Sequence, residues 1–301
     1  MRKLEKVSII GLGAVGCTYG SKLQDLMKNS FKVIASKERA LKYRNNGFII
    51  NGNRYDFTYA DPNEKCEPDD LIIVSVKSTQ LKQAIEDIKN HVGQNTIILS
   101  LLNGITSEEM IGNTYGMEKL LYSICIGDYI HKNNVINFSD ICHIKFGEKT
   151  NFSYSEKVQS VKDLFDRAKI SYEIPEDMMH ILWWKFMMNV GINQSSAVLK
   201  GTYGTFQSNK YAIELMDSAM KEVVELSKKT GVNLNQKDLD NWYKLLSTVN
   251  PNSRTSMCQD VLSGKKTEVD IFAGTVCDLG KKYGIETPVN KTLLNIIKSM
   301  E

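Results

Sequence analysis

The sequence lacks the features that mark several common protein classes. Only five prolines and 20 glycines occur in 301 residues, which argues against collagen-like or linker-dominated architectures. The 38 basic and 35 acidic side chains leave a formal net charge of only +3, without the basic block that nucleic-acid binding requires. No apolar run approaches the roughly 20 residues that span a bilayer. We therefore predict neither a nucleic-acid nor a membrane partner.

Cysteine and histidine are also scarce and scattered. The six cysteines form no CxxC pair, a pattern typical of reduced thiols in a cytoplasmic protein. The four histidines show no HxH or HxxxH spacing, so no metal site is predicted. Basic residues before an apolar stretch at the N-terminus resemble a secretion signal, but Glu5 and three glycines interrupt the pattern. A cytoplasmic location is expected.

What is present is the composition of an ordinary globular protein. The sequence is 42% hydrophobic and 24% charged, and its length corresponds to about two domains. A chain of this size buries a large core without disulfides or metals.

The first motif is a glycine-rich turn between a predicted strand at 7–10 and a predicted helix that follows it. Gly11 would allow the tight turn, Gly13 the close approach of a pyrophosphate, and Gly16 the packing of helix on strand. The helix N-terminus would then face the pyrophosphate with its N–H groups. The alternative is a strand-to-helix turn without a ligand. The predicted cofactor-binding residues here are Gly11, Leu12, Gly13, Ala14, Val15 and Gly16.

The strand predicted at 31–36 ends in the sequence Ser36-Lys37-Glu38-Arg39. Proteins that bind NAD usually place Asp or Glu at this point to accept hydrogen bonds from the ribose 2′-hydroxyl. A hydroxyl followed by cations suits the 2′-phosphate of NADP instead, because the cations can pair with it. Ser36 and Lys37 are therefore predicted to bind NADP, and a solvated loop before a surface helix is the alternative with equal weight.

Two further buried strands are predicted at 71–76 and 96–101. Lys77 and Asn103 come just after their carboxyl ends, where ligands bind in open α/β sheets. Either residue could instead simply start a helix, but two polar groups at corresponding positions favour a ligand edge.

The rest of the chain predicts a change from sheet to helix near residue 175. Strand-like segments at 120–126 and 142–146, with a helix at 156–169, are expected to complete the sheet. We therefore predict an α/β protein with a parallel-sheet domain over 1–174 and an all-helical domain over 175–301. Helices are predicted at 177–197, 209–230, 236–247, 252–263, 267–283 and 288–299.

The predicted helix at 177–197 is apolar nearly all round, which is typical of a buried helix. Lys185, Asn189 and Asn193 nevertheless follow each other at intervals of four on one face. Burying an unpartnered lysine is costly, so this face is expected to line a polar cavity or an interface. The alternative is a lysine whose ammonium extends to solvent beside two structural asparagines.

A second polar set lies between 253 and 270. Ser256 and Asp260 share a helix face at a spacing of four. Thr267 and Asp270 resemble a capping pair, so from spacing alone Glu268 is a first-turn carboxylate that interacts with the helix dipole.

Five motifs in order carry a family resemblance. They are GLGAVG at 11–16, VKSTQ at 76–80, NG at 103–104, WKFMMNVGIN at 184–193 and SMCQDVLSGKKTEVD at 256–270. Over nearly its whole length the chain resembles the ketopantoate reductases (2-dehydropantoate 2-reductases). The resemblance implies NADPH-dependent reduction of 2-dehydropantoate to (R)-pantoate on the route to pantothenate and coenzyme A. It also implies a Rossmann-type domain joined to a helical domain, with the substrate in the cleft between them.

The resemblance also assigns roles to single residues. Lys185 matches the family's catalytic lysine and Glu268 its substrate-binding carboxylate. The matched polar substrate contacts are Asn189, Asn193 and Ser256, and the residues matched near the cofactor are Lys77 and Asn103. The chain departs from the family at Ser36, where Arg is frequent, and at Ser253, where one member has Asn.

Two rival functions remain open at the level of sequence. One is a reductase of another small 2-oxo acid on the same scaffold, and the other is a non-catalytic NADP-sensing protein. The intact face of Lys185, Asn189 and Asn193 favours an enzyme, because a sensor does not need it. A homodimer is the assembly to be tested.

Overall fold

The computed structural model describes residues 2–127, 129–139 and 141–301. The described residues divide into two compact units. The first contains the described residues within 2–102 and 106–178, and the second contains 103–105 and 179–301. No helix in these ranges is both long and apolar enough to cross a membrane.

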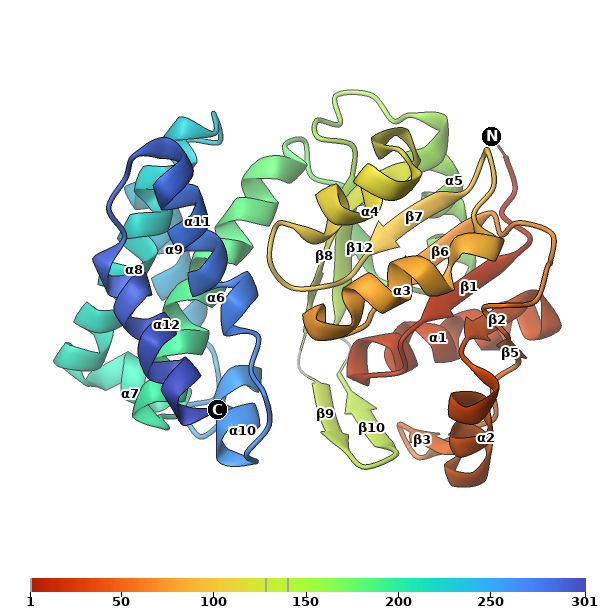
Figure 1. Cartoon of the computed structure of the whole chain (residues 1–301), viewed down its shortest axis with the longest axis horizontal. Helices are drawn as coiled ribbons and strands as arrows, with labels where there is room; N and C mark the ends of the chain where they lie inside the picture. Colours follow the sequence, from red (N-terminus) through yellow and green to blue (C-terminus); the bar gives the residue numbers. More distant parts are fainter. Residues whose placement is uncertain (1, 128, 140) are drawn as a thin grey trace. The chain divides into compact units, whose positions relative to one another are not determined.

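The first unit is built on an eight-stranded sheet with strand order β12-β11-β8-β7-β6-β1-β2-β5 among the described residues (Figure 1). Its strands are β1 (Val7–Ile10), β2 (Phe31–Ile34), β5 (Tyr59–Ala60), β6 (Leu71–Val74), β7 (Ile97–Ser100), β8 (Leu120–Ile126), β11 (His143–Gly147) and β12 (Tyr172–Glu173). Neighbouring strands from β5 to β8 are parallel, and β11 is antiparallel to β8. The carboxyl ends of β1, β2, β6 and β7 therefore share one edge of the sheet.

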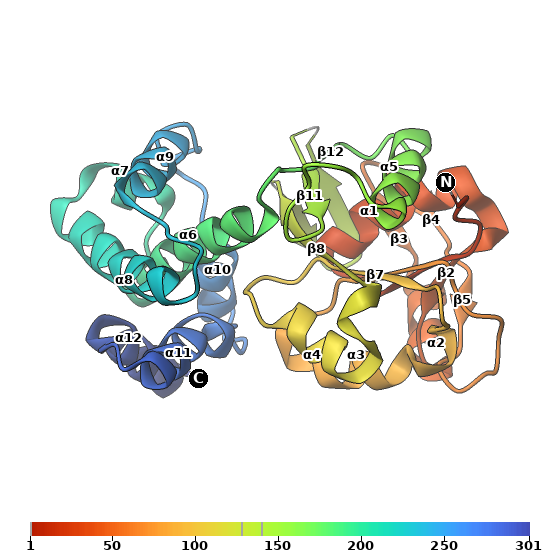
Figure 2. The same ribbon diagram turned by 90° about the horizontal axis from the view of Figure 1, so that it is seen from above.

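Helices cover both faces of this sheet, as an α/β protein requires. Figure 2 shows α1 (Ala14–Met27) and α5 (Glu156–Arg167) on one face, with α3 (Leu81–Asp87) and α4 (Ser107–Tyr115) on the other. The central strands are buried on both faces, which explains their continuous apolar runs. Helix α2 (Lys37–Asn46) follows β2, and short 3₁₀ turns lie at Lys28–Ser30, Ser78–Gln80, Lys89–His91 and Met117–Lys119.

A second sheet was not predicted. It has strand order β4-β3-β10-β9, formed by β3 (Phe48–Ile50), β4 (Asn53–Tyr55), β9 (Tyr129–Lys132) and β10 (Val135–Phe138). This sheet contacts α1 and contributes Phe48, Ile50 and Ile136 to the same core as β1. The strands predicted at 120–126 and 142–146 are β8 and β11 and belong to the main sheet as expected, whereas no strand was predicted for β9 and β10.

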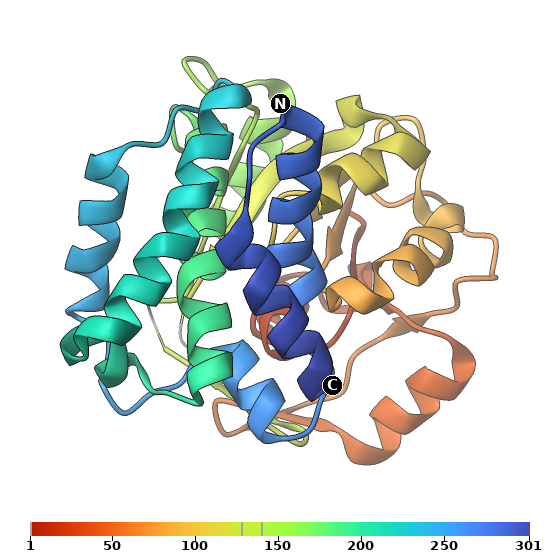
Figure 3. The ribbon, with the colours of Figure 1, turned by 60° about the vertical axis from the view of Figure 1, so that its left-hand side comes forward.

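The second unit is helical, with one central apolar helix, as predicted (Figure 3). Its helices are α6 (Met178–Leu199), α7 (Tyr203–Ser208), α8 (Lys210–Lys229), α9 (Gln236–Leu246), α10 (Ser256–Leu262), α11 (Ala273–Tyr283) and α12 (Pro288–Met300). Trp183, Phe186, Met187 and Val190 of α6 lie in the core of this unit.

Two helix predictions in this unit need correction. The helix predicted at 252–263 begins only at Ser256, because Thr255 is its N-cap and accepts a hydrogen bond from the N–H of Cys258. The helix predicted at 267–283 is broken: a 3₁₀ turn spans Val269–Ile271, and α11 starts at Ala273. Phe272 separates them with φ −103° and ψ −91°, outside helical geometry.

Candidate functional site

The glycine-rich turn between β1 and α1 needs glycine at two positions for steric reasons. Gly11 has φ +99°, a conformation that other residues rarely adopt. A Cβ atom at Gly16 would lie 1.9 Å from the carbonyl oxygen of Gly11. A Cβ atom at Gly13 would meet no atom within 4 Å, so the space in front of Gly13 is open. This is the arrangement that a closely approaching pyrophosphate needs.

Ser75, just after β6, holds this turn in place. Its Oγ donates a hydrogen bond to the carbonyl oxygen of Gly11 at 2.7 Å, and its N–H donates to that of Ile10 at 2.9 Å. A Cβ atom at Gly11 would also lie 2.7 Å from the carbonyl oxygen of Ser75. Sequence reasoning missed Ser75, although a small polar residue inside an apolar strand run was a signal for it.

The N-terminus of α1 follows the turn directly. Gly13 is its N-cap and provides no side chain to accept hydrogen bonds from the first turn. The first N–H groups of a helix have no partner within the helix, and they favour an anion there. Leu12 is buried, whereas Ala14 and Val15 are half-buried. The turn and the helix start thus fit a dinucleotide phosphate.

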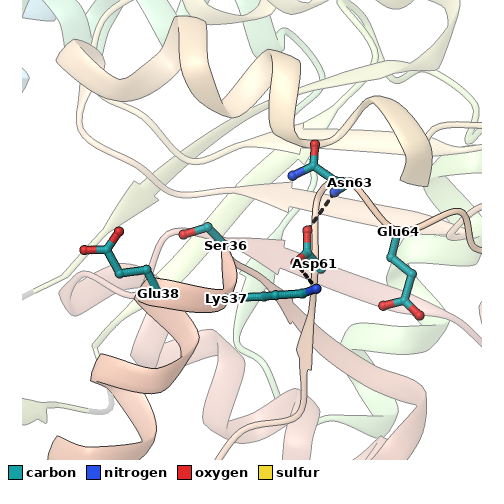
Figure 4. A pocket seen from close by; sticks show the side chains of 6 residues that line it. All are labelled: Ser36, Lys37, Glu38, Asp61, Asn63 and Glu64. Carbon is teal, nitrogen blue, oxygen red and sulfur yellow. Dashed lines mark hydrogen bonds and ion pairs between the residues drawn. The ribbon is translucent and has the colours of Figure 1, made fainter.

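A pocket of about 670 Å³ lies at the carboxyl ends of β2 and β5 (Figure 4). Lys37 Nζ lies 4.0 Å from Oδ2 of Asp61, whose Oδ1 accepts a hydrogen bond from the N–H of Asn63. Figure 4 shows Lys37 reaching toward Asp61, while Glu38 points to the opposite side. The lining residues are Ser36, Lys37, Glu38, Asp61, Asn63 and Glu64.

The lining of this pocket contains more carboxylates than the sequence 36–39 alone indicated, because Asp61 and Glu64 join Glu38 there. Lys37 is 92% exposed, whereas the Asp61 side chain is only 14% exposed, so the carboxylate is the more fixed partner. Ser36 is the N-cap of α2, and its Oγ accepts a hydrogen bond from the N–H of Arg39. Ser36 thus caps α2, and its binding of a cofactor stays a prediction. Asp61 was missed because β5, which precedes it, is only two residues long.

Lys77 and Asn103 follow neighbouring strands but belong to different units. Lys77 is exposed before the 3₁₀ turn at Ser78–Gln80. Asn103 belongs with Gly104 and Ile105 to the second unit. Gly104 turns the backbone there with φ +91°, and a Cβ atom at this position would lie 3.4 Å from Cδ1 of Ile271.

Asn103 links the two residues for which the sequence predicts catalysis and substrate binding. Lys185 Nζ donates to Oδ1 of Asn103 at 3.3 Å, and Nδ2 of Asn103 donates to Oε2 of Glu268 at 3.3 Å. Lys185 itself is only 8% exposed. The ammonium of α6, the amide of the 103–105 segment and the carboxylate of the segment before α11 thus lie next to one another.

The polar face of α6 continues along the helix as predicted. Asn189 and Asn193 are both buried, and Nδ2 of Asn193 donates to Oδ1 of Asn189 at 3.0 Å. Ser256 is exposed at the first residue of α10. Its neighbour Thr255 is buried and shares a 2.6 Å hydrogen bond with Ser196 of α6, a tie that sequence reasoning missed.

The segment that carries Glu268 is not the predicted capping pair. Thr267 donates through both its N–H and its Oγ1 to Oε1 of Glu301, and Asp270 pairs with Lys298. Burial raises the pKa of the Glu301 carboxyl, but the hydrogen bonds from Thr267 and the ion pair with Lys298 outweigh burial and hold that pKa below its usual value. Glu301 is therefore a carboxylate at neutral pH.

Two family models match most of the chain. The family model described as "Ketopantoate reductase PanE/ApbA" matches residues 7–151, and "Ketopantoate reductase PanE/ApbA C terminal" matches 177–301. The chain belongs to the ketopantoate reductase family. Its relatives include the 2-dehydropantoate 2-reductase of Aquifex aeolicus, which is 28% identical and aligns over 98% of this chain and 97% of its own length. Such enzymes are oxidoreductases that act on a small keto acid.

Solved structures show that the fold is shared more widely. A ternary structure of D-mandelate dehydrogenase with NADH and anilino(oxo)acetate superposes with a TM-score of 0.87 at 20% identity, covering 98% of this chain and 97% of that one. A dimeric ketopantoate reductase from Staphylococcus aureus gives a TM-score of 0.83 at 18% identity, covering 98% of both chains.

Proposed function

We propose that this protein reduces 2-dehydropantoate to (R)-pantoate with NADPH, in the supply of pantothenate and coenzyme A. The observation that carries the proposal is the hydrogen-bonded set Lys185–Asn103–Glu268 beside the buried asparagines of α6. A buried lysine held by a neutral amide is suited to stabilise charge on a substrate oxygen. Membership in the ketopantoate reductase family supports the choice of substrate.

Different residues are proposed to bind the substrate and to assist its reduction. The cofactor, when bound, supplies a hydride to the ketone carbon. Lys185 donates a hydrogen bond to the ketone oxygen, stabilises the negative charge that develops there and delivers the proton that completes the alcohol. Glu268 accepts a hydrogen bond from the substrate hydroxyl, and the polar contacts that orient the rest of the substrate are Asn189, Asn193 and Ser256.

The N-terminal range 1–174 is proposed as the cofactor domain and 175–301 as the substrate domain. The open space at Gly13 and the helix start without a capping side chain suit a pyrophosphate. Lys77 and Asn103 are proposed to lie near the cofactor. Ser36 and Lys37 would meet the 2′-phosphate, for which Lys37 must be shared with Asp61. We therefore expect a preference for NADPH over NADH of about tenfold or less.

The fold supports one rival, because a dehydrogenase of another 2-oxo acid shares it. The deciding experiment follows NADPH and NADH oxidation at 340 nm with 2-dehydropantoate and a panel of other 2-oxo acids. The proposal expects the highest kcat/KM with 2-dehydropantoate. A higher kcat/KM with an aromatic or unbranched 2-oxo acid would show that the protein is a dehydrogenase of that acid. Tight NADPH binding without any turnover would show that it is a non-catalytic sensor.

Assembly and location are proposed on separate grounds. We propose a homodimer, as in the Staphylococcus aureus ketopantoate reductase, and the molar mass in solution tests it. The six cysteines of the present chain are all free thiols, and this supports our proposal of a reducing, cytoplasmic location.

A further inference from the structure

The carboxylate of Glu268 lies on a short segment that is held from both sides. Thr267, which precedes it, is 3% exposed and directs two donors to one oxygen of Glu301, at 2.8 Å from its N–H and 2.7 Å from its Oγ1. Asp270, which follows it, accepts a hydrogen bond from Nζ of Lys298 at 2.7 Å. Glu268 therefore lies between two residues that are tied to the end of α12.

Helix α12, to whose end Thr267 and Asp270 are bonded, is itself held by packing and hydrogen bonds. Leu293 and Ile297 of α12 are buried in the core of the unit. At its first turn, the N–H groups of Val289 and Asn290 donate to the carboxylate of Glu222 on α8. The helix is therefore anchored at its start and along its apolar face.

The charges at the end of α12 strengthen the ties. Lys298 Nζ lies 3.2 Å from Oε2 of Glu301 and 2.7 Å from Asp270, so one ammonium bridges two carboxylates. Hydrogen bonds that involve an ionised group are shorter and stronger than neutral ones. The Glu301 side chain is only 11% exposed, which limits competition from water. We call Glu301, Thr267 and Lys298 the Glu301 clamp.

We propose that Glu301 is a positioning residue that holds Glu268 where it binds the substrate, an inference that rests on the function proposed above. Glu301 does not contact the substrate itself. Functional groups need to be held within about 0.5 Å of their working position by packing and hydrogen bonds around them. The Glu301 clamp provides this for the backbone of Glu268, while Asn103 provides it for the carboxylate.

Steady-state kinetics of matched variants tests the proposal. Glu301→Ala and Thr267→Val each weaken the contact between Thr267 and Glu301, and both are expected to raise KM for 2-dehydropantoate roughly tenfold. Because Lys185 is not displaced, kcat is expected to change by less than about threefold, with KM for NADPH unchanged. Thr267→Ser restores the hydroxyl and Glu301→Gln keeps an acceptor, so both should recover most of the substrate affinity. Asp278→Ala, which removes an exposed carboxylate of α11 paired with Lys281, is the control without effect.

Amide hydrogen exchange gives a second readout that does not depend on turnover. In Glu301→Ala the N–H of Thr267 is expected to exchange at least tenfold faster than in wild type, whereas Asp278→Ala leaves it unchanged. Unchanged exchange, or an unchanged KM for 2-dehydropantoate in both variants, overturns the positioning role. A wild-type protein that does not reduce 2-dehydropantoate refutes the proposed function instead, and exchange at Thr267 then still decides whether Glu301 holds this segment.

Discussion

Lys185 and Glu268 hydrogen-bond to opposite ends of the same side-chain amide, that of Asn103. The amide oxygen accepts from the ammonium and the amide nitrogen donates to the carboxylate, so each charged group meets a dipole of the complementary sign. Asn103 thereby bridges the cation for which we propose a catalytic role and the anion for which we propose substrate binding.

Replacing Lys185 by alanine is expected to lower kcat about 10²–10⁴-fold, because the developing alkoxide loses its charge partner and proton donor. The dissociation constant of NADPH, measured by fluorescence titration, should stay within a factor of about three. Lys210→Ala, which removes an exposed lysine of α8, is the control. A Lys185→Ala enzyme with near wild-type kcat would remove Lys185 from the mechanism.

Glu268→Gln is expected to act on substrate binding more than on the chemical step. Gln keeps the size of the side chain but loses the charge that strengthens a hydrogen bond from the substrate hydroxyl, a loss of about 1.5–3 kcal/mol. That corresponds to a 10–100-fold increase in KM for 2-dehydropantoate. Initial rates at saturating NADPH measure it. A fall in kcat with unchanged KM would assign Glu268 to the chemistry instead.

Asp61 is expected to limit the preference for NADPH. Asp61→Asn frees Lys37 for a 2′-phosphate and removes a nearby negative charge, so the kcat/KM ratio of NADPH to NADH should rise about tenfold. Lys37→Ala should lower the same ratio, and both effects should shrink with added salt because Lys37 is exposed. Asp163→Asn is the matched control, because Asp163 lies on α5, outside the lining of this pocket, and pairs with Arg167. If Asp61→Asn leaves the ratio unchanged, this pocket does not determine cofactor choice.

Two glycine substitutions in the turn after β1 are expected to separate folding from cofactor binding. Gly16→Ala should destabilise the protein by about 1–3 kcal/mol, because the added methyl overlaps the carbonyl oxygen of Gly11. Gly13→Ala should leave the thermal unfolding midpoint unchanged, since its Cβ meets open space, but weaken NADPH binding roughly tenfold by filling that space. Equal affinity for NADPH in Gly13→Ala and wild type would place the pyrophosphate elsewhere.

The Asp70 carboxylate is expected to stabilise the folded protein by an amount that falls at acid pH. Burial raises the pKa of its carboxyl, but hydrogen bonds from the N–H groups of Lys6 and Glu5 and the pairing with Arg2 outweigh burial, so the pKa lies below its ordinary value of 3.8. A lowered pKa means that the stabilisation is complete above pH 3.8 and is lost as the pH falls through the lower, folded-state value. Asp70→Asn should therefore cost about 1–2 kcal/mol at pH 7 and at pH 5, and much less at pH 2.5. Urea unfolding at these three pH values measures the difference, and a constant difference would contradict the assignment.

The sequence predicted the elements with strong local signals and missed those made by distant pairing. The strands at 7–10, 71–76 and 96–101 were located to within two residues, because their apolar β-branched runs are continuous. The four-residue strands β9 and β10 join at Asn133, whose φ of +57° completes a hairpin, and they pair within the second sheet rather than the main one.

The same distinction holds for the candidate site. The spacing of Lys185, Asn189 and Asn193 is a property of one helix and was therefore visible in the sequence. Asp61 reaches Lys37 only through the pairing of β5 with β2, in which Ile34 lies opposite Ala60. The contact between Glu301 and Thr267 depends likewise on how α12 packs, which no local pattern encodes.

The assignment of residues 103–105 to the helical unit has a consequence for how this protein could be recombined. The chain contributes these residues from a loop after β7, long before it enters α6. A gene fragment that begins at residue 175 therefore encodes Lys185 and Glu268 but not the asparagine between them. Exchange of the helical half between homologous genes would join these two residues to a foreign loop, so the loop and the helices are expected to evolve as one unit of inheritance despite their distance in the sequence.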